Sequence, residues 1–191
     1  KISKREVSYI NKNFEVERII KFQGIKQGIE NTNYLLKSKK SKFILTIFEK
    51  RVLKKEVPFF MKLMDQLSNL NFNCPKPLKN YRGDYLIKVK NKTACVVSFL
   101  DGKDKKKLNF KNCFDIGKTV AQMHLSAKKL KLYRKNSMGI KNLNPLLNNI
   151  KFKSKKFINL EKFLKNNFKD IKGKWPKKLP QGIIHGDLFI D

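Results

Sequence analysis

Residues 32–48, TNYLLKSKKSKFILTIF, decide how this chain folds. Two apolar segments rich in strand-forming residues, Thr32–Lys37 and Lys42–Phe48, lie on either side of the polar turn Lys39-Lys40-Ser41. Apolar segments of this length joined by a short polar turn are typical of an antiparallel β-hairpin. The sequence therefore predicts two paired strands at the centre of a sheet.

Further strand patterns lie on both sides of this hairpin. Residues 15–22 alternate between polar and apolar side chains, and Tyr85–Lys90 with Thr93–Leu100 form a second predicted hairpin, turned at Asn91-Lys92. Between the hairpins, residues 58–70 carry an apolar stripe at helical spacing and begin with a proline, which suits a first helical turn. We therefore expect a five-stranded antiparallel sheet with one inserted helix, preceded by a short amphipathic helix at residues 5–14.

The second half of the chain has a mainly helical pattern. One helix is expected over residues 110–127 and another over 157–168, with a loop-rich stretch at 132–156 and a short strand at Gly182–Ile184. His124 lies on the apolar face of the first of these helices, where we expect a packed, hydrogen-bonded core histidine.

These patterns predict an α+β fold with two lobes. The predicted division is a β-rich amino-terminal lobe at residues 1–97, a hinge at 98–103 and a partial helical lobe at 104–191.

The charge of the chain is strongly positive. Among 191 residues there are 45 Lys and Arg against 15 Asp and Glu, a formal net charge of +30, yet only five of the basic residues are Arg. Proteins that read phosphates or bases commonly use Arg forks, and the lysines here are spread along the whole sequence. We interpret them as a bias of the genome toward Lys that fills solvated faces, with a functional surface for polyanions as the alternative.

Several classes of protein are excluded by composition. No apolar run approaches the ~20 residues of a membrane span, and the first residues contain no apolar signal-peptide segment. The three cysteines, at 74, 95 and 113, are far apart and form no metal-binding motif. A disulfide framework is therefore not expected, and the reducing cytoplasm is the expected compartment.

Three stretches could carry chemistry, and each also has an ordinary structural explanation. Gly24–Asn33 joins two strands and could fold over a phosphate, although a plain glycine-containing hairpin fits the spacing better. In His185-Gly186-Asp187 the carboxylate after a tight turn could meet a substrate hydroxyl, or the aspartate could only cap the turn. Ser98–Gly102 could present backbone groups to an adenine, or only connect the lobes.

Taken together, these stretches resemble the aminoglycoside phosphotransferase/choline kinase superfamily, and within it the type II homoserine kinases. The residues that carry the resemblance occur in the family's order; they are residues 28–36, 43–51, 58–60 with 63–64, 74–77, 97–102, 117–124 and 185–189. Glu30–Tyr34 and Phe43–Thr46 are specific to the homoserine kinase branch, whereas His185-Gly186-Asp187 marks only the wider superfamily. The resemblance implies a fold like that of the protein kinases.

The resemblance also implies an activity and a set of site residues. The activity is ATP-dependent phosphorylation of the L-homoserine hydroxyl, which gives O-phospho-L-homoserine for threonine synthesis, with Mg²⁺ as cofactor. Asp187 would be the catalytic base, and His185 would brace its loop. The expected nucleotide-binding residues are Gly24, Gly28, Asn31 and Asn33 at the phosphates, Leu45 and Val97 as apolar walls, and the backbone of Ser98, Phe99 and Leu100 at the adenine.

The sequence departs from the family pattern in two places. The third-strand position that usually holds a phosphate-binding Lys or Arg is Thr46, with Lys50 or Arg51 as possible substitutes. The expected metal ligands lie beyond Asp191, so we expect an incomplete, inactive fragment of a longer enzyme. The alternatives are a kinase of this superfamily with an aminoglycoside or choline acceptor, and a nonenzymatic protein that binds nucleic acid through its lysines.

Overall fold

The computed structural model describes residues 1–26, 31–49, 55–103, 105–137, 139–149, 158–176 and 178–190. The chain divides into two compact units. Lys1–Leu132 and Ile183–Asp191 form the first, and Tyr133–Gly182 forms the second. Because this division falls after Leu132, it differs from the predicted hinge at residues 98–103, which stays a prediction.

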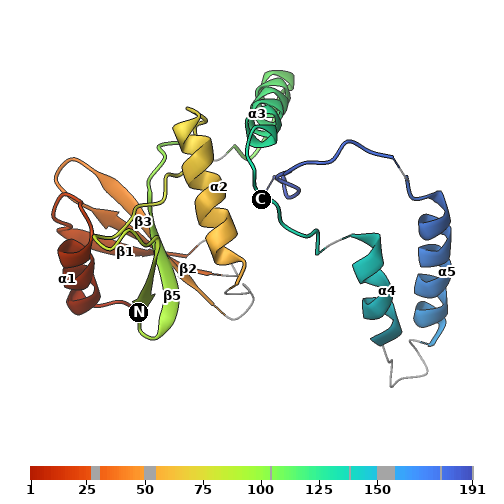
Figure 1. Ribbon diagram of the computed structural model, residues 1–191, viewed down its shortest axis with the longest axis horizontal. Coiled ribbons are helices and arrows are strands. Elements are labelled where there is room, and N and C mark those ends of the chain that lie inside the picture. The colour runs from red at the N-terminus through yellow and green to blue at the C-terminus, as the bar shows by residue number, and fades with distance from the viewer. Residues whose placement is uncertain are drawn as a thin grey trace. The chain divides into compact units, whose positions relative to one another are not determined.

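The first unit is built around an antiparallel sheet with the strand order β1-β2-β3-β5-β4 (Figure 1). Its strands are β1 (Lys21–Ile25), β2 (Asn31–Lys37), β3 (Lys42–Phe48), β4 (Leu86–Val89) and β5 (Lys92–Ser98). The helices of the described chain are α1 (Lys4–Asn13), α2 (Val57–Asn69), α3 (Phe110–Lys128), α4 (Ile140–Asn149) and α5 (Ile158–Lys174). The predicted five-stranded sheet with one inserted helix is confirmed.

The turn between β4 and β5 lies one residue earlier than predicted. Val89 pairs with Lys92, so the two central residues are Lys90 and Asn91. Both have positive φ, 49° and 63°. Two consecutive left-handed residues are what a type I′ turn requires, and its twist matches that of the flanking strands.

Side chains in the sheet alternate between two faces, and residues paired across strands share a face. One row of paired residues contains Tyr34, Leu45 and Val96. The neighbouring row contains Asn33, Thr46 and Cys95. We call the face of the first row the α1 face and the face of the second row the α2 face, after the helix that covers each.

The α1 face holds the main hydrophobic core. Helix α1 begins with a capping box in which Ser3 and Glu6 satisfy each other's backbone amides, and it buries Val7 and Ile10. Ile10 and Leu45 are completely buried in one cluster that joins the helix to this face. Burial of apolar surface contributes about 25 cal/mol per Å² to folding. This cluster is therefore the main favourable contribution to folding.

Helix α2 covers only part of the other face. Its buried residues Val57 and Met61 pack on Cys95 and Val97 of β5. This burial raises the pKa of the Cys95 thiol to about 12, because a thiolate would lose its hydration. Asn33, in the same face but on β2, is only half-buried.

The expected strand at residues 15–22 is wrong in its first six residues. Strand β1 begins at Lys21, and residues 17–20 have no regular structure. The reason is Asn11 of α1: its amide nitrogen donates to the Ile19 carbonyl at 3.2 Å, and its oxygen accepts from the Ile19 amide at 2.8 Å. The side chain thus satisfies both backbone groups that a neighbouring strand would have bound.

Two further expectations from the second half of the sequence are wrong. Helix α4 lies inside the stretch expected to be loop-rich, with Pro145 within it. Gly182–Ile184 has no strand structure. The helix expected at 157–168 is confirmed as α5, which extends to Lys174; Phe157 is outside the described residues.

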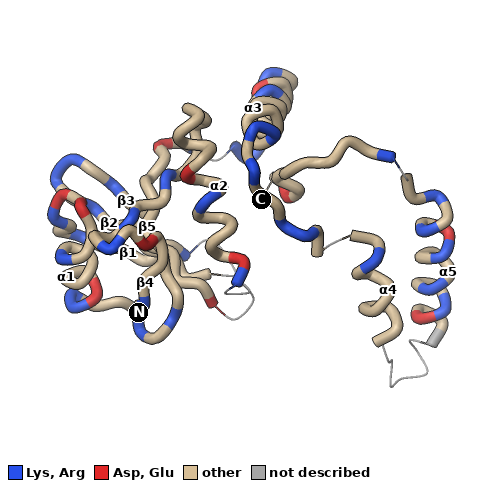
Figure 2. Tube along the Cα trace, viewed as in Figure 1, with Lys and Arg blue, Asp and Glu red and all other residues tan. Residues whose placement is uncertain are grey.

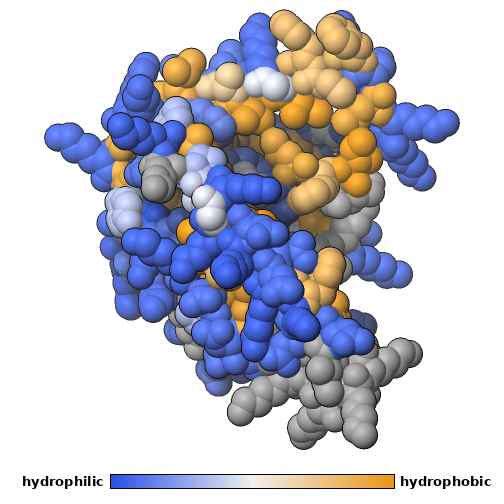
Figure 3. Space-filling view, turned by 90° about the vertical axis from the view of Figure 1, so that its right-hand side faces the viewer, coloured by the Kyte–Doolittle hydropathy of each residue, from blue (hydrophilic) through white to orange (hydrophobic). Residues whose placement is uncertain are grey.

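Helix α3 confirms the predicted helix but not its predicted burial. In the described structure Ala127 is the buried residue of this helix, whereas Phe110 is 88% exposed and Phe114 is 63% exposed. The side of the molecule drawn in Figure 3 likewise shows apolar side chains at the surface. His124 is half-buried, and its Nε2 atom has no hydrogen-bond partner in the described part of the chain, contrary to the hydrogen-bonded histidine expected.

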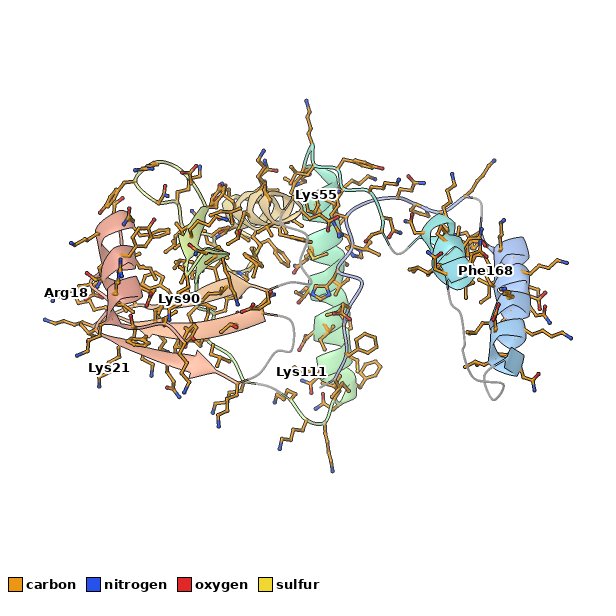
Figure 4. All side chains as sticks on the ribbon, turned by 90° about the horizontal axis from the view of Figure 1, so that it is seen from below. Arg18, Lys21, Lys55, Lys90, Lys111 and Phe168 are labelled. Carbon is orange, nitrogen blue, oxygen red and sulfur yellow. The ribbon has the colours of Figure 1, made fainter. Side chains whose placement is uncertain are left out.

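The basic residues are distributed over the elements rather than gathered on one (Figure 2). Lys21, Lys90 and Lys111, labelled in Figure 4, lie on β1, on the β4–β5 turn and on α3. This distribution supports the interpretation of lysine as a filler of solvated faces.

Candidate functional site

The open part of the α2 face brings together several of the predicted nucleotide-binding residues. Asn31 and Asn33 of β2 are two residues apart, so both side chains lie on this face, and Asn33 is paired with Thr46 of β3. Ile44 of the same strand is paired with Val97. The result is a row of polar groups beside an apolar strip.

Both asparagines accept hydrogen bonds, one from β3 and one from the residue that follows it. The Thr46 hydroxyl donates to Oδ1 of Asn33 at 2.9 Å. The backbone amide of Glu49 donates to Oδ1 of Asn31 over a longer distance, 3.4 Å. The Asn33 amide is thus oriented by an ordinary hydrogen bond, whereas the contact to Asn31 is long for an N–H···O bond.

Glu49 marks the end of β3 and has its carboxylate on the other face of the sheet. One carboxylate oxygen accepts from the Thr32 hydroxyl at 2.9 Å, and the other accepts from the Lys92 ammonium at 2.5 Å. The hydrogen bond from Lys92, followed by that from Thr32, holds the pKa of the Glu49 carboxyl below its usual value. Lys50 and Arg51, the predicted substitutes for a third-strand cation, lie outside the described residues.

The two predicted apolar walls cannot line one pocket. Leu45 is completely buried in the α1 face, whereas Val97 belongs to the α2 face. Adjacent residues of a strand point to opposite faces, so the side chain beside Val97 is that of Ile44. Sequence reasoning missed Ile44, although the alternation along β3 could have indicated it.

The predicted glycine loop is shorter than expected. Gly24 lies within β1 and is paired with Tyr34 of β2, so it belongs to the hairpin itself. A Cβ atom at Gly24 would lie 3.7 Å from the Tyr34 ring, which is ordinary contact. Gly28 lies outside the described residues.

The predicted adenine-binding connector is partly occupied by its own hydrogen bonds. The Ser98 amide donates to the Lys76 carbonyl at 2.9 Å, and the Phe99 amide donates to the Lys42 carbonyl at 3.2 Å. These two amides are therefore not free donors for an adenine. In the described part of the chain the Leu100 amide has no such partner, so it is the donor of this stretch that remains for a ligand.

Lys42 also fastens this connector through its side chain. Its ammonium group donates to the Asp101 carboxylate at 2.8 Å and lies 5.0 Å from the centre of the Phe99 ring. Asp101 is 84% exposed, so the ion pair contributes at most about 1 kcal/mol.

The tight turn expected at His185-Gly186-Asp187 stays a prediction, because these residues have no assigned turn or bend. Gly186 has φ of 73°, a left-handed conformation that favours glycine. The Asp187 amide donates to Nδ1 of His185 at 3.3 Å, which is a local contact within this segment. Both side chains are exposed, and the segment from Ile183 belongs to the same compact unit as the sheet. Their catalytic roles stay predictions.

Several hollows lie beside the sheet. One of about 430 Å³ borders the α2 face and is lined in part by Gln23 and Leu35. A larger one of about 610 Å³ lies between α1 and the segment before β1. Neither of these two hollows is lined by a predicted site residue among those that the structure describes.

Comparison of the sequence with known families identifies the chain. Residues 21–191 match the sequence pattern of the phosphotransferase enzyme family. The chain belongs to this family.

Curated relatives of this phosphotransferase chain include several homoserine kinases. It is similar to the homoserine kinase of Parvibaculum lavamentivorans, with 32% identity over 179 residues, which are 93% of this chain and 56% of that protein. The homoserine kinase of Rhizobium etli is 32% identical over 191 residues, 100% of this chain and 60% of that protein. The chain therefore spans a little more than half the length of these relatives.

Solved structures show the same fold at low sequence identity. A spectinomycin phosphotransferase in complex with ADP and spectinomycin has a TM-score of 0.60 and 11% identity, covering 100% of this chain and 64% of that one. A microcompartment-associated aminopropanol kinase has a TM-score of 0.58 and 12% identity, covering 76% and 49%. The kinase-like fold predicted from the sequence is confirmed.

Metal binding is not assigned to residues of this phosphotransferase chain. The described residues bring together no group of three His, Cys, Asp or Glu side chains that could hold a metal ion.

None of the described helices is both long enough and apolar enough to cross a membrane.

Proposed function

We propose that this chain is the nucleotide-binding part of a homoserine kinase, which transfers the γ-phosphoryl group of ATP to the hydroxyl of L-homoserine. The observation that carries the proposal is the similarity to homoserine kinases along 93–100% of the chain. The open α2 face supports it, because this face presents fixed polar groups beside an apolar strip, as a nucleotide with phosphates and a flat base requires.

In this proposal the nucleotide lies against the open α2 face. Asn31 and Asn33 lie at its phosphates, the half-buried Ile44 contacts the adenine, and the Leu100 amide donates to the base, while Val97 supports Ile44 from beneath α2. Ile44 replaces Leu45 in this role, because Leu45 is turned into the core on the other face.

Asp187 is proposed to accept the proton of the homoserine hydroxyl as that oxygen attacks the γ-phosphorus. The bond from the γ-phosphorus to the bridging oxygen of ADP breaks, and the products are O-phospho-L-homoserine and ADP. His185 keeps the turn closed through the hydrogen bond that it accepts from the Asp187 amide. Mg²⁺ bound with the nucleotide would neutralise charge on the phosphates.

A binding experiment tests the nucleotide part of this proposal on the chain itself. ATP is expected to raise the melting temperature of the purified chain in a concentration-dependent manner, because a ligand of the folded state stabilises it. Because the chain spans 55–60% of its relatives, we expect binding without turnover. Absence of any ATP effect would contradict the proposal.

An activity assay tests the acceptor. ADP formation by the product of the complete reading frame is measured with L-homoserine, choline and kanamycin in parallel. We expect turnover with L-homoserine, and a loss of about 10²- to 10⁴-fold in Asp187→Asn, since a general base of this kind contributes that much. Turnover with choline or kanamycin alone would show that the fold is right and the acceptor is wrong.

A further inference from the structure

We propose that the groove between helix α1 and the outer edge of β4, called the β4 groove below, is a docking site for an extended acidic segment of another protein. This segment would add to the sheet as a further strand beside β4. The groove lies at the opposite end of the sheet from β1, because β4 and β1 are its two edge strands. The proposal is independent of the proposed function, since it uses none of the residues assigned to the nucleotide.

The backbone of β4 can pair with a further strand. Val89 and Lys92 close a two-residue hairpin turn, so Val89 and, two residues earlier, Ile87 exchange hydrogen bonds with β5. The backbone N–H and C=O groups of Leu86 and Lys88 therefore point away from β5. Within the described ranges these four groups have no hydrogen-bond partner. An edge strand of this kind is a template for another extended segment.

Two adjoining hollows form the β4 groove. One, of about 440 Å³, is lined in part by Tyr9 and Asn13 of α1 and by Lys88 of β4. The other, of about 410 Å³, is lined in part by Arg5, Tyr9 and Lys88. The hollows adjoin because they share Tyr9 and Lys88. Arg5, Tyr9 and Asn13 are spaced four residues apart, so one side of α1 forms a wall of the groove.

The residue types in the lining distinguish the β4 groove from the lysine-covered surface in general. The chain has only five arginines, and two of them, Arg5 and Arg82, line this groove. A bias toward lysine explains neither. Both arginines are exposed, and in the described part of the chain no carboxylate pairs with them. Tyr9, which lines both hollows, is 41% exposed. Arg and Tyr are enriched among the residues that contribute most to protein interfaces.

The charge of the lining favours an acidic partner. The basic residues of the lining are Arg5, Arg82, Lys88 and Lys90, and its acidic residues are Glu6 and Asp84. The Glu6 carboxylate is already bound to Ser3. Carboxylates of a docked segment could therefore pair with the two guanidinium groups. A second copy of this chain is a poorer occupant, because its formal net charge is +30 and its own β4 groove would bring the same charges.

A binding experiment with designed peptides tests the proposal on the full chain. The probe is a short peptide of alternating Glu and Val, which places its carboxylates on one side when extended. A peptide of alternating Lys and Val tests the sign of the charge. A peptide of alternating Glu and Pro keeps the negative charge but opposes strand pairing, because proline has no amide N–H. Affinities are measured by titration calorimetry, and hydrogen exchange is followed at the amides of Leu86 and Lys88.

We expect the Glu–Val peptide to bind more tightly than both control peptides and to slow exchange at these two amides. Arg5→Gln and Arg82→Gln should each weaken its binding by about three- to tenfold. The matched control is Arg18→Gln, which makes the same change of charge at an exposed arginine before β1, labelled in Figure 4, and should stay within about twofold. Circular dichroism and thermal melting establish that each variant is folded.

The proposal would be overturned by several results. Absence of Glu–Val binding would do so, as would equal binding of the Glu–Pro peptide or equal weakening in Arg18→Gln, since these would indicate general attraction to a basic surface. Binding that leaves exchange at Leu86 and Lys88 unchanged would rule out an added strand. Dimerisation of the chain in sedimentation experiments, abolished by Lys88→Pro and accompanied by no peptide binding, would assign the edge to a second copy instead.

Discussion

The two faces of the same sheet differ in what their side chains can do. On the α1 face, Leu45 and Val96 are completely buried beneath a helix, and the core there is continuous. On the α2 face, helix α2 covers the β5 side, while Asn33 and Thr46 stay half-buried and bound to each other. A sheet that is closed on one face and partly open on the other supplies both stability and a place for a ligand.

The largest expected effect comes from truncating adjacent residues of β3 that point to opposite faces. Leu45→Ala should lower the free energy of unfolding by about 2–5 kcal/mol, because it leaves a cavity in a fully buried core. Ile44→Ala should cost less than Leu45→Ala and should weaken ATP binding instead. Urea unfolding and nucleotide titration of both variants measure this contrast, and equal losses of stability would contradict the distinction between the faces.

The covered part of the α2 face can be tested through Cys95. Its pKa is raised to about 12, so above the ordinary thiol pKa the unfolded chain loses a proton that the folded chain keeps. Stability should therefore fall as pH rises, by about 2 kcal/mol between pH 8.5 and 10.5. Chemical unfolding at several pH values measures this slope.

The control for this prediction is Cys95→Ala, in which lysine titration contributes as before but the thiol does not. The difference between the two slopes isolates the buried thiol. Identical slopes would show that α2 does not seal this part of the face.

A smaller effect is expected where the segment before β1 is fastened to α1. Asn11→Ala removes both hydrogen bonds to Ile19 and should cost about 1–3 kcal/mol, because it leaves two partly buried backbone groups without partners. Asn13→Ala, whose side chain bonds the Tyr9 carbonyl at an exposed position of the same helix, is the matched control. Comparable losses in both variants would contradict the special role of Asn11.

The smallest effect concerns Glu49, whose carboxylate lies on the α1 face. Because its pKa is depressed, its contribution to stability is present above the ordinary carboxyl pKa and is lost as pH falls through the folded value. Glu49→Gln should therefore flatten the loss of stability in acid, which unfolding curves between pH 3 and 6 detect. An unchanged acid slope would show that the Lys92 and Thr32 contacts are not maintained in solution.

The strands of the sheet could be predicted because the sequence patterns that indicate them involve residues close together in the chain. The hairpin around residues 39–41 and the helix after Pro58 follow from periodicity and turn composition, which depend on neighbouring residues alone. The segment at 15–20 misled the prediction because its alternation is that of a strand, whereas the side chain of Asn11, earlier in the chain, takes both hydrogen bonds of the Ile19 backbone. Helix α4 was missed because Pro145 is a typical helix breaker.

The predicted site residues can be placed on the sheet, but their roles at a nucleotide stay predictions. Asn31, Asn33 and Val97 lie on one face, with Val97 buried beneath α2, whereas Leu45 lies on the other face, where its neighbour Ile44 does not. The residues of the Ser98–Leu100 connector were named without knowing which amides are occupied. The amides of Ser98 and Phe99 are occupied by the carbonyls of Lys76 and Lys42, which are distant from them in sequence and adjacent to them in space.

By itself the sequence determined the hairpins, the helix inserted between them and the kinship with phosphotransferases, because alternation, turn residues and motif order are properties of the linear chain. Only the tertiary structure decided which helix covers which face and which amides already have partners. Those features depend on the register between strands, and a shift of one residue in that register would exchange the two faces.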